Sequence, residues 1–126
     1  MYHRVLYKEK MYFCHINQFD RTMDVEIMKD KIKANVLEMN PKAEVWLYGS
    51  RARGTARVDS DWDVLVLTPD DRLSVQEEGR FIDHICELMV ATGQVIQLFA
   101  YGKSDWHGRH SVTPFYHSVQ QEAIRL

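Results

Sequence analysis

Two short stretches, LYGSRARG at residues 47–54 and DSDWDVLV at residues 59–66, carry most of the information in this sequence. The first is typical of a strand that ends in a Gly-Ser turn, and the second of an apolar strand with an acidic start. Together they fit the pattern G-S-x10-D-x-D, in which ten residues separate Ser50 from Asp61. We therefore expect two central strands, with the turn after the first strand facing the acidic pair that begins the second.

The turn at Gly49 and Ser50 is the predicted binding position for phosphate groups. A strand that runs through this turn into a short helix leaves backbone amides free, and glycine lets phosphate oxygens approach closely. Ser50 adds a hydroxyl donor. Arg51 and Arg53 follow in the first turn, where a guanidinium pairs well with phosphate oxygens, and Arg53 is the stronger candidate. We expect Gly49, Ser50, Arg51 and Arg53 to bind a nucleotide.

Asp61 and Asp63 are the predicted metal ligands and catalytic residues. They lie two residues apart at the start of a strand, so both carboxylates face the same side, roughly 6.6 Å apart along the strand. Carboxylate oxygens suit Mg²⁺, with Mn²⁺ as an alternative, and waters and substrate phosphates complete the coordination. In a two-metal site, with ions about 3.5–4 Å apart, one ion activates the attacking oxygen and the other holds the triphosphate and the leaving pyrophosphate.

The simplest alternative is a Gly-Ser turn followed by acidic residues that only solvate the end of a loop. Two carboxylates at the start of an otherwise apolar strand need a reason to share a face, and a Gly-Ser turn at this distance supplies one. The flanking residues Arg57 and Asp59 are interpreted as solvated loop charges.

The motif resembles the minimal nucleotidyltransferases of the DNA polymerase beta-like superfamily, and the resemblance spans roughly residues 24–101. It implies a mixed sheet that carries the acidic pair, and a Mg²⁺ cofactor. It also implies transfer of a nucleoside monophosphate from a triphosphate to a hydroxyl, with loss of pyrophosphate. AMP from ATP is the expected choice. Arg53 matches the phosphate-contacting arginine of G-S-x-x-R. Many such minimal members are similar to antitoxins encoded beside a helical toxin partner, and some of these modify that toxin with adenylate.

The sequence departs from this family at one position. Members usually carry a third carboxylate on a later strand, which completes the metal site and helps to deprotonate the acceptor hydroxyl. The corresponding strand here, VIQLF at residues 95–99, has Gln97 as its only polar residue in mid-strand, and an amide is a weak neutral ligand and no base. Asp105, just past that strand, is a candidate substitute.

The order of predicted elements indicates an α+β (α/β-like) fold, in which a small mixed sheet is backed by helices on one face. Residues 24–126 are assigned to this nucleotidyltransferase domain, and residues 1–23 to an N-terminal extension with an extra strand or hairpin. The predicted elements are a helix over residues 24–40, strands over 43–48, 64–67 and 95–101, a helix from the capping box at Ser74 and Glu77 to Gly93, and a helix that starts at Thr113-Pro114 with an apolar face continuing to Leu126.

Composition narrows the classes of partner. The formal net charge of -2 leaves no basic field for a nucleic-acid backbone, and no apolar run approaches the ~20 residues that span a bilayer. Cys14 and Cys86 lie far apart and no signal peptide is evident, so we expect a reducing, cytoplasmic location. The group His107, His110 and His117 lacks the spacing of a metal site. The expected partners are a nucleoside triphosphate and a protein such as a helical toxin, with a homo-oligomer left open.

Three functions remain open from the sequence. The first is an enzyme that transfers a nucleotidyl group, and the second is a nucleotide-binding module with weak or no turnover that acts as an antitoxin-like partner-binding protein. Gln97 is the main support for the second function. The third is an interaction domain without a nucleotide.

Overall fold

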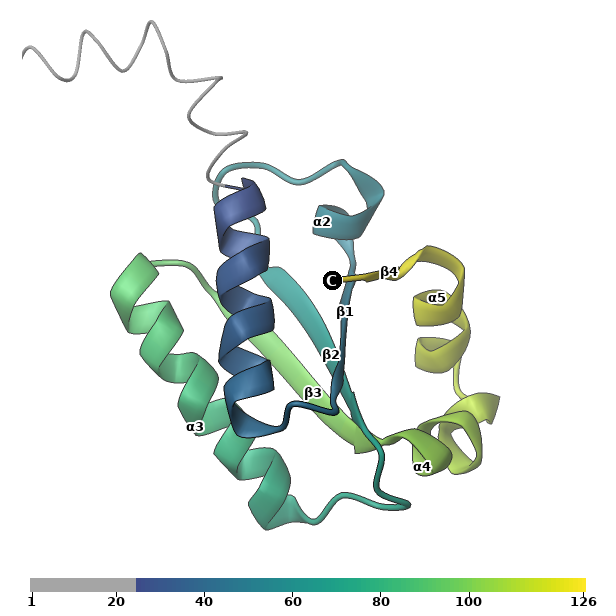
Figure 1. Ribbon diagram of the computed structural model, residues 1–126. Coiled ribbons are helices and arrows are strands. Elements are labelled where there is room, and N and C mark those ends of the chain that lie inside the picture. Colours follow the sequence, from purple (N-terminus) through teal and green to yellow (C-terminus); the bar gives the residue numbers. More distant parts are fainter. Residues whose placement is uncertain (1–24) are drawn as a thin grey trace, which may run out of the picture.

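The computed structural model describes residues 25–126, and the extension predicted over residues 1–23 lies outside the described residues (Figure 1). The elements are a helix over residues 25–39, β1 (Glu44–Tyr48), α2 (Ser50–Arg53), β2 (Trp62–Thr68), α3 (Val75–Thr92), β3 (Ile96–Gly102), α4 (Lys103–His107), the 3-10 helix η1 (Arg109–Val112), α5 (Pro114–Glu122) and β4 (Ile124–Arg125). All the predicted elements within the described residues are present. The short elements α4 and η1 are additions that the sequence patterns do not predict.

The strands form one mixed sheet in the order β3-β2-β1-β4. β1 is antiparallel to both of its neighbours, whereas β2 and β3 are parallel. Parallel neighbours need a crossover connection, and α3 supplies it between β2 and β3. The predicted α+β fold with a small mixed sheet is thus confirmed.

The helix over residues 25–39 and α3 cover one face of the sheet (Figure 1). Apolar side chains at helical spacing on these helices meet alternating side chains of the strands, which forms the larger core: Met28, Ile32, Val36, Phe81 and Ile85 against Val45, Leu47, Trp62, Val64, Val66, Ile96, Leu98 and Ala100. The predicted layer of helices is present on this face, and the cover that helices form on part of the opposite face was not predicted. None of the described helices has the length and hydropathy needed to cross a bilayer.

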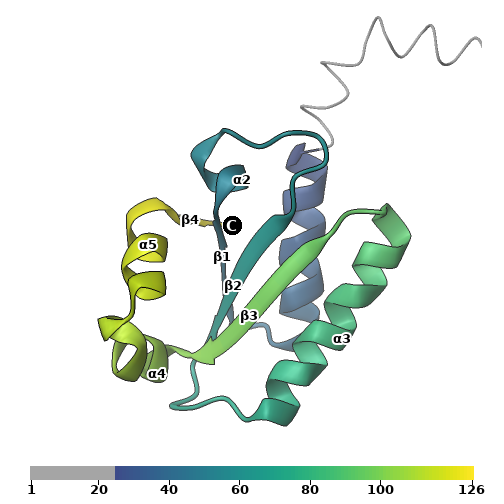
Figure 2. The same cartoon turned by 180° about the vertical axis from the view of Figure 1, so that it is seen from behind.

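A second, smaller layer covers part of the opposite face, where α4 and α5 pack against β1 and β2 (Figure 2). Its centre is Trp106, which is fully buried against Leu65, Leu67 and Val119. Side chains alternate across a strand, so Asp63 points to this second face while Trp62 belongs to the larger core. The acidic pair therefore lies beside the C-terminal helices.

Local capping signals explain where the long helix α3 begins and ends. The Ser74 hydroxyl accepts a hydrogen bond from the Glu77 amide, and the Glu77 carboxylate accepts one from the Ser74 amide. Gly93 ends the helix in the left-handed region, with φ 72°. Both features match the capping box and C-cap that the sequence predicts.

The C-terminal helix is shorter than its apolar pattern predicts. The expectation that the helical face continues to Leu126 is wrong, because α5 ends at Glu122 and the chain returns to the sheet as β4. The Leu126 amide donates to the Val45 carbonyl at 2.9 Å, and Ile124 pairs with Leu47. The free edge of β1 thus offers the last residues hydrogen-bond partners that replace those of a continued helix.

Candidate functional site

Gly49 and Asp63 are in direct contact where β1 ends and β2 begins. Tyr48 and Asp63 are paired across the two strands, and Gly49 follows with φ 74° and ψ -157°. A Cβ atom at Gly49 would overlap the Asp63 carboxylate, so only glycine fits here. The expected proximity of the Gly-Ser turn to the acidic pair is confirmed by this geometry.

The two carboxylates of the acidic pair lie close enough to influence each other. Partial burial, together with the charge of Asp61, raises the pKa of Asp63 above its usual range, while Arg53 acts in the opposite direction. The Gln97 Nε2 atom donates to Asp61 Oδ2 at 3.1 Å, and Gln97 is the strand partner of Asp63. The structure therefore brings Asp61, Asp63 and Gln97 to one patch of the sheet.

A third carboxylate, that of Glu122, reaches the same patch from the last residue of α5. Its Oε2 atom accepts a hydrogen bond from the Gly49 amide at 2.6 Å. Arg53 Nη1 donates to Oε1 at 3.0 Å and to Oε2 at 3.1 Å. The Glu122 side chain is 19% exposed and that of Arg53 50%. The turn, the arginine and this carboxylate form one connected hydrogen-bonded group.

Sequence reasoning did not single out Glu122. One weak signal exists, because a negative charge in the last turn of a helix opposes the helix dipole and so needs a partner. That partner, however, lies 69 residues away at Arg53 and 73 residues away at Gly49. Nothing in the local pattern identifies it.

Arg51 lies away from the acidic pair, on the other side of the sheet. Its Nη2 atom donates to the Ser60 carbonyl at 2.9 Å and to the Val58 carbonyl at 3.3 Å, and its guanidinium carbon lies 4.3 Å from the centre of the Trp62 ring. Arg51 therefore ties the connection between α2 and β2 to the strand, and its predicted contact with a nucleotide remains a prediction.

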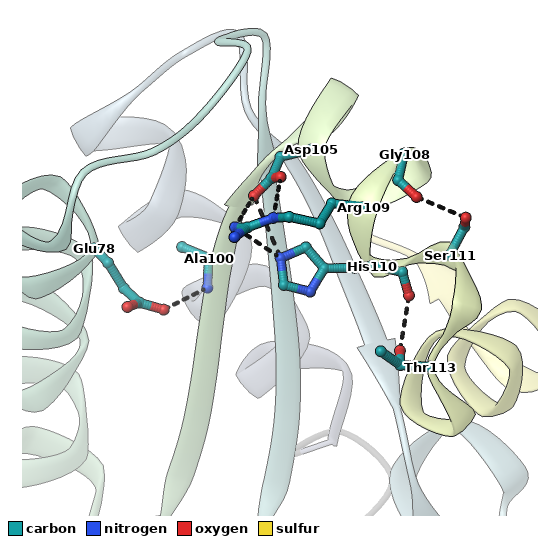
Figure 3. Close-up of polar contacts among 8 residues, drawn as sticks. All are labelled: Glu78, Ala100, Asp105, Gly108, Arg109, His110, Ser111 and Thr113. Atoms are coloured by element: carbon teal, nitrogen blue, oxygen red, sulfur yellow. Dashed lines mark hydrogen bonds and ion pairs between the residues drawn. The ribbon is translucent and has the colours of Figure 1, made fainter.

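Asp105 lies beyond the end of β3 that is distant from Gln97, and Figure 3 shows its surroundings. The five steps from one residue to the next between Gln97 and Gly102 extend along the strand by roughly 16 Å. The Asp105 carboxylate is bound by Arg109 through two hydrogen bonds of 2.9 Å, with His110 at 3.3 Å. Arg109 holds the pKa of Asp105 below its usual range. The structure does not bring this proposed substitute to the acidic pair.

The donor set can be tested against a bound metal ion. Within residues 25–126, no three His, Cys, Asp or Glu side chains form a group that could hold a metal by themselves. Mg²⁺ is commonly held by one or two carboxylates, with phosphate oxygens and waters as its other ligands. Asp61 and Asp63 fit that requirement when a triphosphate supplies the rest.

The family model of the nucleotidyltransferase domain matches residues 29–107. This match covers more than half of the 126 residues and includes Gly49, both aspartates and Gln97, whereas Glu122 lies outside it. The chain therefore belongs to the nucleotidyltransferase domain family, as its motif predicts. Comparison with the curated proteins gives no significant match.

Solved structures share the fold. One, a toxin-antitoxin complex with AMP-PNP, is 22% identical, with 76% of this chain and 69% of that chain covered and a TM-score of 0.56. Another, the tri-AMPylated Shewanella oneidensis HEPN toxin in complex with an MNT antitoxin, is 19% identical, with 80% and 70% covered and a TM-score of 0.54. At these identities the likeness establishes the fold.

Proposed function

We propose that this chain is a metal-dependent nucleotidyltransferase that transfers a nucleoside monophosphate, with AMP from ATP as the first choice, to a hydroxyl acceptor. The contact between Gly49 and Asp63 carries this proposal, because it joins a backbone turn suited to phosphate with a carboxylate pair suited to metal. In this assignment Gly49, Ser50 and Arg53 bind the triphosphate, and Asp61 and Asp63 are the metal ligands and catalytic residues.

The charges of the site explain why a divalent cation is required. The site brings together three carboxylates, those of Asp61, Asp63 and Glu122, and among residues 25–126 the ion pair formed with them is that of Arg53 with Glu122. A triphosphate would be repelled from this surface without added positive charge. Bound Mg²⁺ would supply that charge and stabilise the leaving pyrophosphate. In the reaction the acceptor hydroxyl gives up its proton to water, its oxygen bonds to the α-phosphorus, the bond from that phosphorus to the bridging oxygen breaks, and pyrophosphate leaves.

The second candidate function is a nucleotide-binding module that acts mainly by binding a protein, as an antitoxin would. Gln97 supports it, because an amide stands beside Asp61 and Asp63 and cannot accept the proton of an acceptor hydroxyl. The solved structures of similar fold contain a toxin beside an MNT antitoxin, which also supports a helical toxin as the partner and acceptor.

Transfer of label tests the enzymatic proposal. The protein is incubated with Mg²⁺, each of the four triphosphates labelled at the α-phosphate, and candidate acceptors that include the product of the neighbouring gene. We expect label to appear on an acceptor from one triphosphate, and Asp61→Ala to abolish the transfer. If no triphosphate binds, the proposed function is wrong.

Gln97→Glu separates the two candidate functions. Binding of Mg²⁺ and ATP without turnover in the wild type, followed by transfer in Gln97→Glu, would establish the binding module. Comparable transfer by both proteins would show that the reaction proceeds without a third carboxylate on β3. Gln94→Glu, at a position bonded to Trp62 on the other face, is the matched control for an added charge.

A further inference from the structure

Glu122 occupies hydrogen-bond donors that the proposed function assigns to the triphosphate, and the inference below rests on that function. The Gly49 amide has a single hydrogen to donate, and in this structure it points at Glu122 Oε2. The Arg53 guanidinium is turned to the same carboxylate and contacts both of its oxygens. A carboxylate oxygen and a phosphate oxygen are chemically similar acceptors for these donors.

The contact is also electrostatically unfavourable for the neighbouring acidic pair. Glu122 adds a third carboxylate beside Asp61 and Asp63, because it is bonded to the amide of Gly49, the residue that touches the Asp63 carboxylate. A carboxylate at this position is stabilised by Arg53 and the Gly49 amide. The same carboxylate is destabilised once a triphosphate competes for these two partners.

We propose that Glu122 competes with the triphosphate for the same hydrogen-bond donors. The Glu122 carboxylate must leave Gly49 and Arg53 before the nucleotide binds there. The side chain stands in for a phosphate group while the site is free, and this keeps the donors paired and lowers the affinity for triphosphates. Only the fraction of molecules in which the carboxylate has left these donors can bind, and the apparent affinity is reduced to that fraction of its intrinsic value. Because Glu122 lies outside the matched residues 29–107, this control belongs to the C-terminal end of the chain.

The position of Glu122 in the fold makes the displacement feasible. It is the last residue of α5, and the following strand β4 has two residues, both exposed. A rotation of the side chain frees the donors without breaking the pairing of Ile124 with Leu47. Nucleotide binding therefore changes a contact that joins the end of α5 to the turn after β1.

Titration calorimetry of the full chain with Mg²⁺-ATP, and with inorganic tripolyphosphate plus Mg²⁺, tests the proposal. We expect Glu122→Gln to bind both ligands about fivefold to tenfold more tightly than the wild type, because the neutral amide is a weaker competitor. Glu122→Asp, which keeps the charge but is one methylene shorter, should tighten binding by less. Amide spectra should show the Gly49 resonance shifting in Glu122→Gln before any ligand is added.

The matched control is Glu44→Gln. Glu44 is paired with Lys103 and accepts a hydrogen bond from Trp46, at the other end of β1, and it is buried to a similar degree as Glu122. This variant should bind both ligands as the wild type does. Urea unfolding of all variants reports whether the fold is intact.

Two results separate failure of this inference from failure of the proposed function. The inference alone is overturned if the wild type binds nucleotide and the folded variants Glu122→Gln and Glu122→Asp bind it equally or more weakly. Glu122 would then only stabilise the turn at Gly49. Absence of binding by the wild type and by every variant overturns the proposed function and this inference with it.

Discussion

Two carboxylates in this protein are held by an arginine through two hydrogen bonds, and their surroundings differ. Asp105 is bound by Arg109, four residues later in the chain, and stands apart from the acidic pair. Glu122 is bound by Arg53 across 69 residues, beside a glycine amide and an aspartate whose pKa is raised. The comparison teaches that an ion pair alone does not identify a site. A functional site is indicated when the ion pair lies beside other carboxylates that repel its own carboxylate.

The largest expected effect sets Asp63→Asn against Asp105→Asn. Asp63→Asn should lower nucleotidyl transfer by roughly 100-fold or more, because a metal ligand is lost. It should also raise the free energy of unfolding, since burial and Asp61 disfavour the charged form of Asp63 in the folded state. Asp105→Asn should leave transfer unchanged and lower stability, because Arg109 favours its charged form. Transfer assays and urea unfolding measure the activity and the stability of both variants. Changes in the free energy of unfolding that have the same sign in the two variants would contradict the prediction.

The second prediction compares two glycines with positive φ, Gly49 and Gly54. Gly54→Ala meets open space, so it should reduce stability by about 1 kcal/mol, the conformational cost of a left-handed alanine. Gly49→Ala adds an overlap with the Asp63 carboxylate and also places alanine at φ 74° and ψ -157°, a conformation that is essentially restricted to glycine, and the two effects bring the loss to about 2–4 kcal/mol.

Chemical unfolding gives both losses of stability, and a transfer assay should show that Gly54→Ala is active and Gly49→Ala is not. Equal losses in the two variants would mean that neither the backbone conformation of Gly49 nor its contact with Asp63 restricts that position.

The juxtaposition of the turn and the acidic pair could be predicted from sequence because both parts lie at the ends of neighbouring strands. The Gly-Ser turn follows β1, Asp63 is the second residue of β2, and adjacent antiparallel strands bring these ends together. The limits of α3 could be predicted for a similar reason, since Ser74, Glu77 and Gly93 act on the helix through their own local hydrogen bonds.

Contacts that depend on the direction of a distant element could not be predicted. Asp105 follows β3 closely in sequence, but β3 is parallel to β2, so the residues after it lie at the end of the sheet opposite to Asp63. Glu122 reaches Gly49 only because α5 ends at that residue, and the apolar pattern continues past it. After the helix the chain bonds to β1 through the Leu126 amide and the Val45 carbonyl, and no local pattern around Glu122 reveals this contact.

The third prediction sets Arg53→Gln against Arg51→Gln, two arginines that the motif alone treats alike. Arg53→Gln should weaken binding of Mg²⁺-ATP about tenfold, since one charge-assisted contact with phosphate is lost. Arg51→Gln should leave binding unchanged and lower stability by about 1 kcal/mol, because it loses two carbonyl partners and its position over Trp62. Calorimetry and thermal unfolding separate the two. A loss of affinity in Arg51→Gln with unchanged melting would assign that residue to the nucleotide.

The smallest expected effect concerns a paired histidine that, like Asp105, serves the fold. The His84 ring joins α3 to the helix over residues 25–39, with Nε2 2.8 Å from Glu38 and Nδ1 3.3 Å from Glu87. The hydrogen bond with Glu38 raises the pKa of His84 above its ordinary value of 6.5. A raised folded-state pKa contributes stability that is fully present below pH 6.5 and is lost as the pH rises through the folded value.

Urea unfolding of the wild type and of His84→Gln at about pH 6 and pH 8.5 measures this contribution. The wild type should lose more stability than His84→Gln between the two pH values. Subtracting the change in the variant from that in the wild type removes the contributions of the other titrating groups. Glu38→Gln should remove most of the same pH dependence, because it takes away the main cause of the shift. Neither substitution should change the affinity for nucleotide. His84 and Glu38 belong to the helices that cover the same face of the sheet as Trp62, and Asp63 points to the opposite face. A change in affinity would mean that packing between the two helices reaches the turn at Gly49.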